Sequence, residues 1–391
     1  MSSSLSTRPI YLDSHATTPV DPQVLAAMLP FFTDYFGNPS SLNHSYGWAA
    51  EAGVEKAREI LAAAIHAEPV EIIFTSGATE ANNLAIKGVA ESYMAHGKHI
   101  ITVQTEHNAV LDPCRYLETL GFSVTYLPVD ADGLVDITTL KEAFRPETIL
   151  VSVMTANNEI GVLQPISEIG QLCHQRGVIF HTDAAQALGK IPLNVQAMNI
   201  DLLSMTAHKL YGPKGIGALY VRRRNPRVQI APQLHGGGQE KGVRSGTLYT
   251  PQIVGFGEAV RLALAGQAVE MERMRGLRDR LWTHLCKLPG IHLNGHPTQR
   301  LPNNLNVSIE GVNGSALLSK LQSEVALSSG SACSSANPTP SHVIKALGRR
   351  DELARATLRF GLGRTTTEEE IERAGEIVVK GVRSLRQTAP I

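Results

Sequence analysis

A lysine lies in a turn rich in glycine and proline, between two short apolar runs. Lys209 follows the run 201–205 and precedes the turn 212–215, after which a second apolar run, 216–221, begins. A side chain in such a turn at a strand end can come close to a ligand. A lysine in this position can form a Schiff base with a carbonyl cofactor. Taken alone, Lys209 would more readily be an ordinary surface lysine, so the rest of the chain has to decide.

Other chemically capable side chains also follow short apolar runs. In open α/β sheets, ligands bind outside the carboxyl ends of the strands. The small turn 76–82 opens a helix, whose free N–H groups and Thr79 can hold a phosphate. His107 can stack on a planar ring or move protons near neutral pH. Each feature has a structural alternative, because the turn can be an ordinary N-cap and the histidine a capping or solvated residue.

Two later strand ends complete the set. Asn158, in a polar turn, can donate to a carboxylate or ring oxygen, or can be an ordinary turn residue. Asp183 can pair with a pyridine nitrogen, with Gln186 on the same side, or can cap a helix. Together, a phosphate seat, a stacking histidine, this aspartate and Lys209 fit pyridoxal 5′-phosphate. A hydride-transfer cofactor needs no lysine, and a metal needs clustered ligands, so no metal is expected.

The cysteines suggest a second chemical group. Cys333 lies in the Ser/Gly/Ala-rich segment 328–336, where little bulk surrounds it, as is typical of a reactive thiol. Cys114, Cys173 and Cys286 lie in helical patterns and are expected to be packing residues. None has CxxC spacing, so neither a zinc site nor a disulfide framework is indicated, and a cytoplasmic location is expected.

Length and composition set further bounds. The chain has 391 residues, which favours two domains. Its formal net charge of +0 indicates neither nucleic acid nor an anionic membrane as a main partner. The first ten residues lack the apolar core of a signal peptide, and no run approaches the roughly 18 apolar residues of a membrane span.

Short apolar runs alternate with helical patterns, which is the signature of a largely parallel sheet covered by helices. We therefore predict an α/β fold: a large domain with a mostly parallel seven-stranded sheet, plus a smaller α+β domain. A helical stretch over about 252–288 is expected to carry the chain between them. The predicted limits are 14–262 for the large domain, and 1–13 with 263–391 for the small one. The predicted strands of the large sheet are 72–75, 100–103, 123–127, 149–154, 178–182, 202–205 and 216–221.

Several motifs resemble one known family over nearly the whole chain. The chain resembles the cysteine desulfurases of the NifS/IscS type, in the class V aminotransferase family of fold-type I pyridoxal-phosphate enzymes. The segments around Lys209 and Cys333 are together highly specific for it. The motifs include Phe74–Glu80, Glu106–His107, Asn157–Gly161, Asp183–Gln186, His208–Gly215, Arg244–Thr247 and Ser328–Cys333.

The resemblance implies conversion of L-cysteine to L-alanine, with the sulfur left as a persulfide on Cys333. It implies that Lys209 bonds the cofactor and moves the Cα proton, and that His107 stacks on the ring. Asn158 and Arg359 would take the substrate carboxylate. The cofactor ligands that it implies are Ala78, Thr79, His107, Asn158, Asp183, Gln186, Thr206, His208, Lys209 and Thr247.

The resemblance also implies a homodimer, with Thr247 reaching into the partner's site, and a sulfur-acceptor protein such as an iron–sulfur scaffold or a sulfur relay. Two departures are notable. Ser14-His15 replaces the expected Asn-Ala, and we expect this change to touch no chemical group. The chain stops at Ile391, soon after its last predicted helix, so scaffold docking through a C-terminal extension is not expected.

Alternatives remain open from the sequence. A selenocysteine lyase or another C–S lyase on the same fold would keep both chemical groups. A simple aminotransferase would need no second nucleophile. A sulfur carrier or scaffold that merely binds pyridoxal phosphate would leave the acid–base residues unused.

Overall fold

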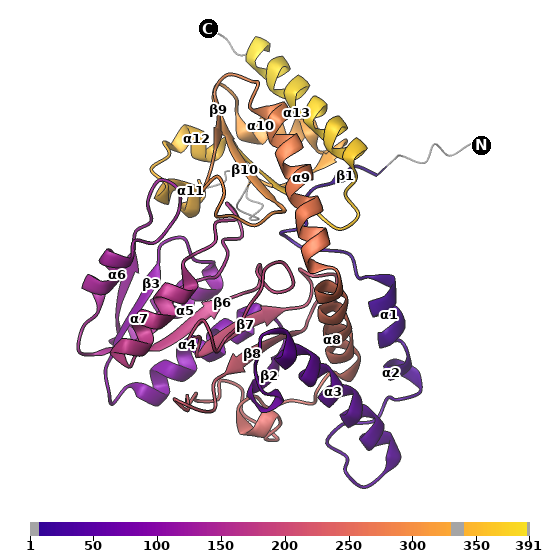
Figure 1. The fold of residues 1–391 in the computed structure, drawn as a ribbon, viewed down its shortest axis with the longest axis vertical. Coiled ribbons are helices and arrows are strands. Elements are labelled where there is room, and N and C mark those ends of the chain that lie inside the picture. Colours follow the sequence, from indigo (N-terminus) through magenta and orange to yellow (C-terminus); the bar gives the residue numbers. More distant parts are fainter. Residues whose placement is uncertain (1–7, 330–339, 389–391) are drawn as a thin grey trace.

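The computed structural model describes residues 8–329 and 340–388, which form a large α/β lobe and a smaller α+β lobe (Figure 1). The large lobe contains a seven-stranded sheet of order β2-β8-β7-β6-β5-β3-β4. Its strands are β2 (Ile72–Thr75), β3 (His99–Val103), β4 (Ser123–Leu127), β5 (Thr148–Ser152), β6 (Ile179–Asp183), β7 (Leu202–Thr206) and β8 (Gly217–Val221).

The sheet is parallel except for β8, which runs antiparallel to both of its neighbours, β2 and β7. Every residue of β2, β3, β5, β6, β7 and β8 is buried. Strands covered on both faces read as continuous apolar runs, which is why the sequence located these six. The seventh, β4, lies at the edge of the sheet and is only partly buried. The predicted fold class is confirmed.

Helices cover both faces of this sheet. On one face, Leu61 of α3 and Phe256 of α8 pack with Phe74 of β2. On the other face, Leu84 of α4 packs with Ile73, because neighbouring residues of a strand point to opposite faces. The helices of the large lobe are α1 (Pro22–Met28), α2 (Pro30–Thr33), α3 (Ser45–Ala64), α4 (Ala78–Tyr93), α5 (Asn108–Thr119), α6 (Ile137–Ala143), α7 (Ile166–Arg176) and α8 (Thr250–Ala265), with 3-10 turns η1 (Pro69–Glu71) and η2 (Glu240–Gly242).

The smaller lobe has its own core, in which Ile10 and Leu12 from the N-terminal segment pack with Leu281 and Phe360. Its sheets have the orders β12-β10-β9 and β1-β11. The domain limits at 13/14 and 262/263 stay a prediction. The elements of this lobe are β1 (Ile10–Tyr11), α9 (Gln267–Leu285), β9 (Ile291–Leu293), β10 (Asn304–Ile309), α10 (Gly314–Leu321), β11 (Val325–Ala326), α11 (His342–Ala346), α12 (Asp351–Arg355), β12 (Thr357–Gly361) and α13 (Glu368–Thr388).

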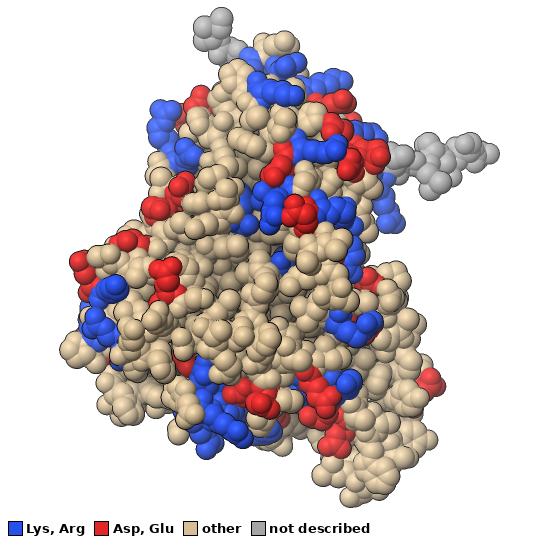
Figure 2. Space-filling view, in the orientation of Figure 1, with Lys and Arg blue, Asp and Glu red and all other residues tan. Residues whose placement is uncertain are grey.

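The helical stretch predicted over 252–288 is divided. It breaks at Gly266 into α8, which packs on α3, and α9, which packs on α13. The chain therefore passes from one lobe to the other at this glycine. Figure 2 shows acidic and basic side chains intermixed on one face of the molecule. In the described part of the chain, no helix combines the length and apolar character that a membrane span requires.

Candidate active site

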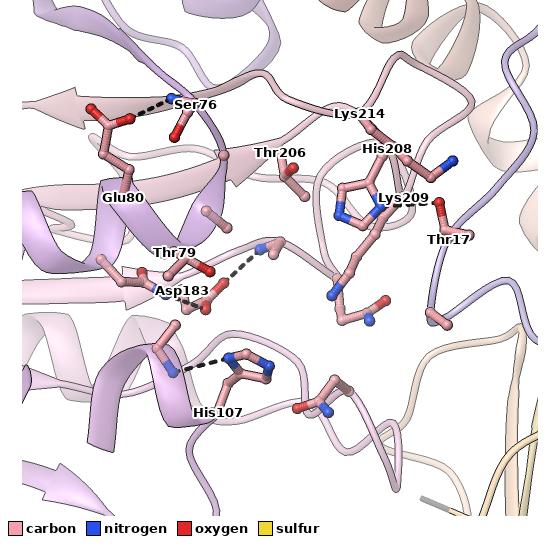
Figure 3. A pocket seen from close by; sticks show the side chains of 18 of the residues that line it. Thr17, Ser76, Thr79, Glu80, His107, Asp183, Thr206, His208, Lys209 and Lys214 are labelled. Atoms are coloured by element: carbon pink, nitrogen blue, oxygen red, sulfur yellow. Dashed lines mark hydrogen bonds between the residues drawn. The ribbon is translucent and has the colours of Figure 1, made fainter. Parts of the chain in front are cut away.

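A cavity of about 540 Å³ opens where β6 and β7 end. Lys209 and Asp183 extend toward the same space from two strand ends, with His107 below them (Figure 3). Adjacent parallel strands bring their carboxyl ends to one edge of the sheet, so residues far apart in the chain meet there. The predicted site residues that line this cavity are Ala78, Thr79, His107, Asn158, Asp183, Gln186, Thr206, His208 and Lys209.

The N-terminus of α4 forms one wall of the cavity. This 16-residue helix begins at Ala78, and its first backbone N–H groups and the Thr79 hydroxyl are available to an anion. Glu80 fixes the preceding turn, because its carboxylate accepts from the Ser76 amide at 2.7 Å and pairs with Arg244 at 2.7 Å. The turn therefore keeps its shape and is suited to a phosphate group.

His208 faces this wall. Its Nδ1 lies 3.1 Å from the Thr17 hydroxyl. Burial, helped by the charges of Lys209 and Lys214, lowers the pKa of His208 to about 4. The imidazole is neutral at pH 7 and can therefore donate or accept one hydrogen bond at the cavity wall.

Asp183 is held by two hydrogen bonds. Its Oδ2 accepts from Asn82 Nδ2 at 2.7 Å, and its Oδ1 accepts from the Ala185 amide at 2.8 Å. The sequence did not reveal Asn82. The only signal was a polar residue within the apolar stripe of α4, where Asn82 is 0% exposed. Asn82 fixes the carboxylate that faces the cavity.

His107 has two roles. It caps α5, since its Nδ1 accepts from the Ala109 amide at 3.1 Å, and its ring also lines the cavity. The capping alternative is therefore confirmed, whereas stacking on a planar ring stays a prediction. Desolvation by surrounding protein lowers the pKa of His107. Because Nδ1 accepts the Ala109 hydrogen bond, Nε2 is the ring nitrogen that can donate.

Lys209 lines the cavity from the turn that follows β7, three residues after the strand ends at Thr206. Burial lowers the pKa of Lys209, with Arg359 adding to the effect and Asp183 opposing it. More of this lysine is therefore a neutral amine at pH 7 than in an exposed lysine, and only the neutral amine attacks a carbonyl.

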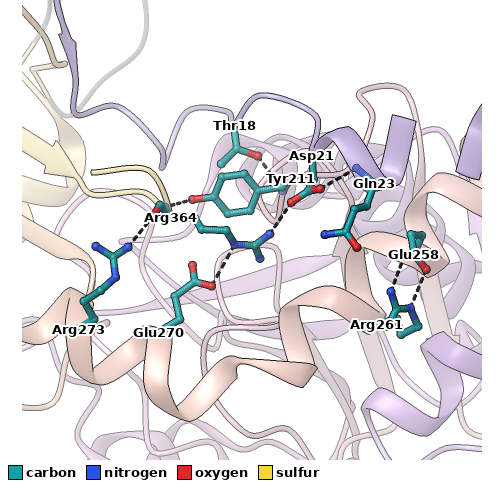
Figure 4. A network of polar contacts seen from close by, with 9 residues as sticks. All are labelled: Thr18, Asp21, Gln23, Tyr211, Glu258, Arg261, Glu270, Arg273 and Arg364. Atoms are coloured by element: carbon teal, nitrogen blue, oxygen red, sulfur yellow. Dashed lines mark hydrogen bonds and ion pairs between the residues drawn. The ribbon is translucent and has the colours of Figure 1, made fainter. Parts of the chain in front are cut away.

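Residues 13–21, here called the N-terminal strap, hold the Lys209 turn in place. Thr18 Oγ1 donates to the His208 carbonyl at 3.0 Å and accepts from the Tyr211 amide at 2.8 Å. Tyr211 has φ +65°, an uncommon conformation for a non-glycine residue. The Arg364 guanidinium lies over the Tyr211 ring and pairs with Asp21 and Glu270 (Figure 4). Both lobes therefore contact the turn that carries Lys209.

Arg359 lies behind the cavity wall. It is 2% exposed, pairs with Asp13 at 2.9 Å and donates to the Asn158 carbonyl at 3.0 Å. Asn158 Oδ1 is buried and has no hydrogen-bond partner among the described residues. The structure therefore brings Asn158 and Arg359 together, as predicted, although only Asn158 lines the cavity.

Four predictions have other outcomes. Cys333 lies outside the described residues. Thr247 does not line the cavity of its own chain and lies instead in a groove with Phe32 and Tyr249. The prediction that Cys286 packs inside was wrong: it follows the last turn of α9 and is exposed. The expectation for Ser14-His15 was also wrong, because the His15 ring hydrogen-bonds the site residue Gln186 at 3.0 Å.

The donor set fits pyridoxal phosphate. The free N–H groups of α4 suit the phosphate, the Asp183 carboxylate suits a protonated ring nitrogen, and the Lys209 amine suits the aldehyde. The unpartnered Asn158 Oδ1 leaves a polar atom for a ligand. No group of three or more histidine, cysteine or acidic side chains in the described ranges could hold a metal ion.

Comparisons with known proteins agree. The model of the family Aminotransferase class-V matches residues 10–374. The cysteine desulfurase IscS of Methylococcus capsulatus is 54% identical over 98% of this chain and 94% of that protein.

Solved structures are also similar. A NifS-like protein has a TM-score of 0.90 at 37% identity, covering 96% of this chain and 100% of that one. A structure of SspA in complex with cysteine has a TM-score of 0.78 at 41% identity, covering 90% and 98%. The chain therefore belongs to the aminotransferase class-V family, in its group of NifS/IscS-type cysteine desulfurases, which are pyridoxal-phosphate enzymes.

Proposed function

We propose that this protein removes sulfur from L-cysteine, releasing L-alanine and leaving a persulfide on Cys333. The observation that carries the proposal is the placement of the Lys209 amine and the Asp183 carboxylate in one cavity, beside the N-terminus of α4. The names of the similar proteins, and the cysteine bound in the SspA structure, support the choice of substrate. A selenocysteine lyase, or another C–S lyase on this fold, is the alternative.

The cavity residues divide the work of holding the cofactor. The phosphate would lie against α4, with hydrogen bonds from Thr79, Thr206 and His208, while His107 would stack on the ring. When bound, pyridoxal phosphate supplies a carbonyl that bonds an amine and a ring that withdraws electrons from the substrate. Asp183 is held by its two donors, so its carboxylate would pair with the ring nitrogen. Gln186 would contact the ring hydroxyl.

Lys209 would handle the substrate proton. Its lowered pKa provides a neutral amine that can take a proton from Cα and return one later in the reaction. The substrate carboxylate would be bound by the side chain of Asn158. The guanidinium of Arg359, at the back of the same wall, supports this position with its positive charge.

The described residues on either side of the cysteine segment border the cavity wall. Ser328 accepts a hydrogen bond from the Arg359 amide at 2.7 Å. Ser341 donates to Glu159 at 2.6 Å, and the His342 ring contacts the backbone carbonyl of Glu106, next to His107. These anchors support a sulfur transfer in which the Cys333 thiolate attacks the substrate sulfur and the carbon–sulfur bond breaks toward the substrate carbon.

A homodimer is part of the proposal. Helices α1, α2 and α3 lie together at one side of the large lobe (Figure 1) and expose a run of large apolar side chains. Thr247 lies in a groove of this surface rather than in its own cavity, which suits a residue that reaches into a second copy of the chain. The exposed side chains are Leu25, Leu29, Phe32, Tyr35, Phe36, Leu42, Tyr46, Trp48 and Tyr249.

The persulfide needs an acceptor. We propose a sulfur-acceptor protein, such as an iron–sulfur scaffold or a sulfur relay, in the cytoplasm. A net charge of +0 supports a protein acceptor rather than direct nucleic-acid binding.

Purified protein should be yellow, and it should release alanine and sulfide from L-cysteine in the presence of a reductant. Borohydride should attach the cofactor to the peptide that contains Lys209. Cys333→Ser should keep the cofactor but lose sulfide release by several powers of ten, because a hydroxyl is a poor nucleophile toward sulfur. Alanine and sulfide release that survives Cys333→Ser would contradict the persulfide route. Selenide released much faster than sulfide from the matched substrates would favour the alternative.

A further inference from the structure

A buried polar cluster lies directly behind the cavity wall. It consists of His15, Gln186 and Lys190, which are 1%, 2% and 9% exposed. Of the three, only Gln186 lines the cavity. His15 comes from the N-terminal strap, whereas the other two follow β6, so the cluster joins segments that are 171 residues apart in the chain.

The hydrogen bonds fix the orientation of the Gln186 amide. The amide oxygen lies 2.9 Å from Lys190 Nζ, which can donate to it whether the amine is charged or neutral. The His15 backbone carbonyl can only accept, so the amide nitrogen must be the atom 2.9 Å from it. The His15 ring Nδ1, 3.0 Å from the same amide oxygen, must then carry a proton and donate.

These hydrogen bonds satisfy the amide oxygen of Gln186 completely and its amide nitrogen in part. The oxygen accepts two hydrogen bonds, from Lys190 and His15, which fill both of its lone pairs. The amide nitrogen donates one of its two protons to the His15 carbonyl. The group that remains is the second N–H of Gln186, which makes the residue a donor to the cavity that its side chain lines.

The charges around the cluster keep His15 neutral. Burial lowers the pKa of His15 well below its ordinary value, and Lys190, Arg359 and Lys209 add to this effect. Lys190 forms no ion pair in the part of the chain that the structure covers, although the charge of Glu270 acts on it and opposes the lowering of its pKa by burial and Lys209. The amide of Gln186 is the hydrogen-bond partner of Lys190 there. The cluster therefore contains two donors whose shared acceptor is one amide oxygen.

We propose that His15 and Lys190 are positioning residues: they lock the Gln186 amide so that its free N–H, and not its oxygen, faces the ring hydroxyl oxygen of the cofactor. The inference rests on the proposed cofactor site. A donor at that oxygen stabilises negative charge there, and so eases loss of the neighbouring proton that gives the bound cofactor its pH-dependent colour. Without the two donors, only the hydrogen bond to the His15 backbone carbonyl still holds the amide. The amide then spends part of its time turned over, with its oxygen toward the same atom, which the oxygen would repel.

The test uses the holoenzyme and the pH midpoint of its visible absorption change. His15→Asn and His15→Leu have nearly the same shape, but only asparagine can donate to the amide oxygen. His15→Asn should titrate like the parent, and His15→Leu should titrate about one pH unit higher, a tenfold change in the proton equilibrium. Ser14→Ala, in the neighbouring residue of the strap, is the control and should leave the midpoint unchanged.

A second set of variants separates positioning from direct charge. Lys190→Met should raise the midpoint, and Gln186→Ala should raise it at least as much. Adding Lys190→Met to Gln186→Ala should give no further shift, because Lys190 acts through the amide. A full shift in that background would mean that Lys190 acts on Lys209 by charge, and would overturn the proposal. Equal midpoints for His15→Asn and His15→Leu would overturn it as well.

The experiment distinguishes failure of this inference from failure of the proposed function. If the parent carries no visible band, the cofactor assignment itself fails. If the parent carries the band and releases alanine while all His15 and Lys190 variants titrate like it, the positioning inference alone fails.

Discussion

Arg58 and Glu240 form a buried ion pair, and we expect the removal of either partner alone to lower the unfolding free energy strongly. Arg58 donates to both carboxylate oxygens of Glu240, at 2.8 and 2.9 Å, and the Phe74 amide donates to one of them at 2.7 Å. The two residues are 8% and 7% exposed. Glu240 and Lys241 both have positive φ, so this contact pins a strained turn of the segment that leads to Thr247 to the edge of β2.

The expected loss of unfolding free energy depends on whether each substitution leaves a buried charge without its partner. Arg58→Met leaves a buried carboxylate with the Phe74 amide as its remaining donor, and should cost about 3–5 kcal/mol of unfolding free energy. Replacing both residues by methionine leaves no buried charge. The double variant should therefore be more stable than Arg58→Met, with a loss of about 2 kcal/mol or less. The experiment is urea unfolding of the four proteins of this cycle at one protein and cofactor concentration.

Glu55→Gln provides a matched control. Glu55 pairs with the same Arg58, at 3.0 Å, but its side chain is 53% exposed. Its loss should change the unfolding free energy by less than about 0.5 kcal/mol. If the double variant were as unstable as the sum of its single variants, the penalty would come from lost packing, and the argument from an unpaired buried charge would be refuted.

Three further predictions concern the site. Burial and the charge of Lys209 lower the pKa of Lys190 from 10.5 to about 7, so only the unfolded chain keeps this proton between these pH values. The unfolding free energy of the parent relative to Lys190→Met should therefore rise with pH over this range, by at most about 5 kcal/mol, and a pH-independent difference in urea unfolding would contradict the shift. Asn82→Ala removes a hydrogen bond to a charged group, which is worth about 1.5–3 kcal/mol, and should lower alanine release about 10- to 100-fold, whereas parental rates would show that Asp183 needs no such support. Mixing inactive Lys209→Ala with inactive Thr247→Ala should restore part of the activity if sites are shared, and a monomer in sedimentation would remove the basis for this expectation.

The strands were predicted to within one or two residues because burial on both faces makes all of them except β4 a nearly continuous apolar run. The direction of β8 could not be predicted, since its apolar pattern does not depend on whether its neighbours run parallel to it. The break at Gly266 was also missed. The helical pattern continues on both sides of this glycine, and only the packing of α8 and α9 on different lobes separates them.

The cavity could be predicted because the carboxyl ends of neighbouring strands must meet, so chain order alone brought Asp183 and Lys209 together. The supporting residues depend on tertiary packing that no local pattern encodes. His15 reaches the site only because the N-terminal strap crosses from the small lobe. Asn82 is a polar residue among apolar positions of α4, and its partner could not be identified without the structure.

The contacts of Arg364 and the strap with the Lys209 turn make two segments far apart in the chain part of the cofactor site. A ligand bonded to Lys209 stabilises every contact that opens when this turn moves, and at a thousandfold excess over its dissociation constant it contributes about 4 kcal/mol. Binding of the cofactor therefore stabilises the contact between the lobes, where Arg364 donates to Asp21 and the Ser14 amide donates to the Gly361 carbonyl. Proteases that cut either segment should act much faster on the cofactor-free protein, so quality control of newly made chains would depend on the supply of the vitamin-derived cofactor.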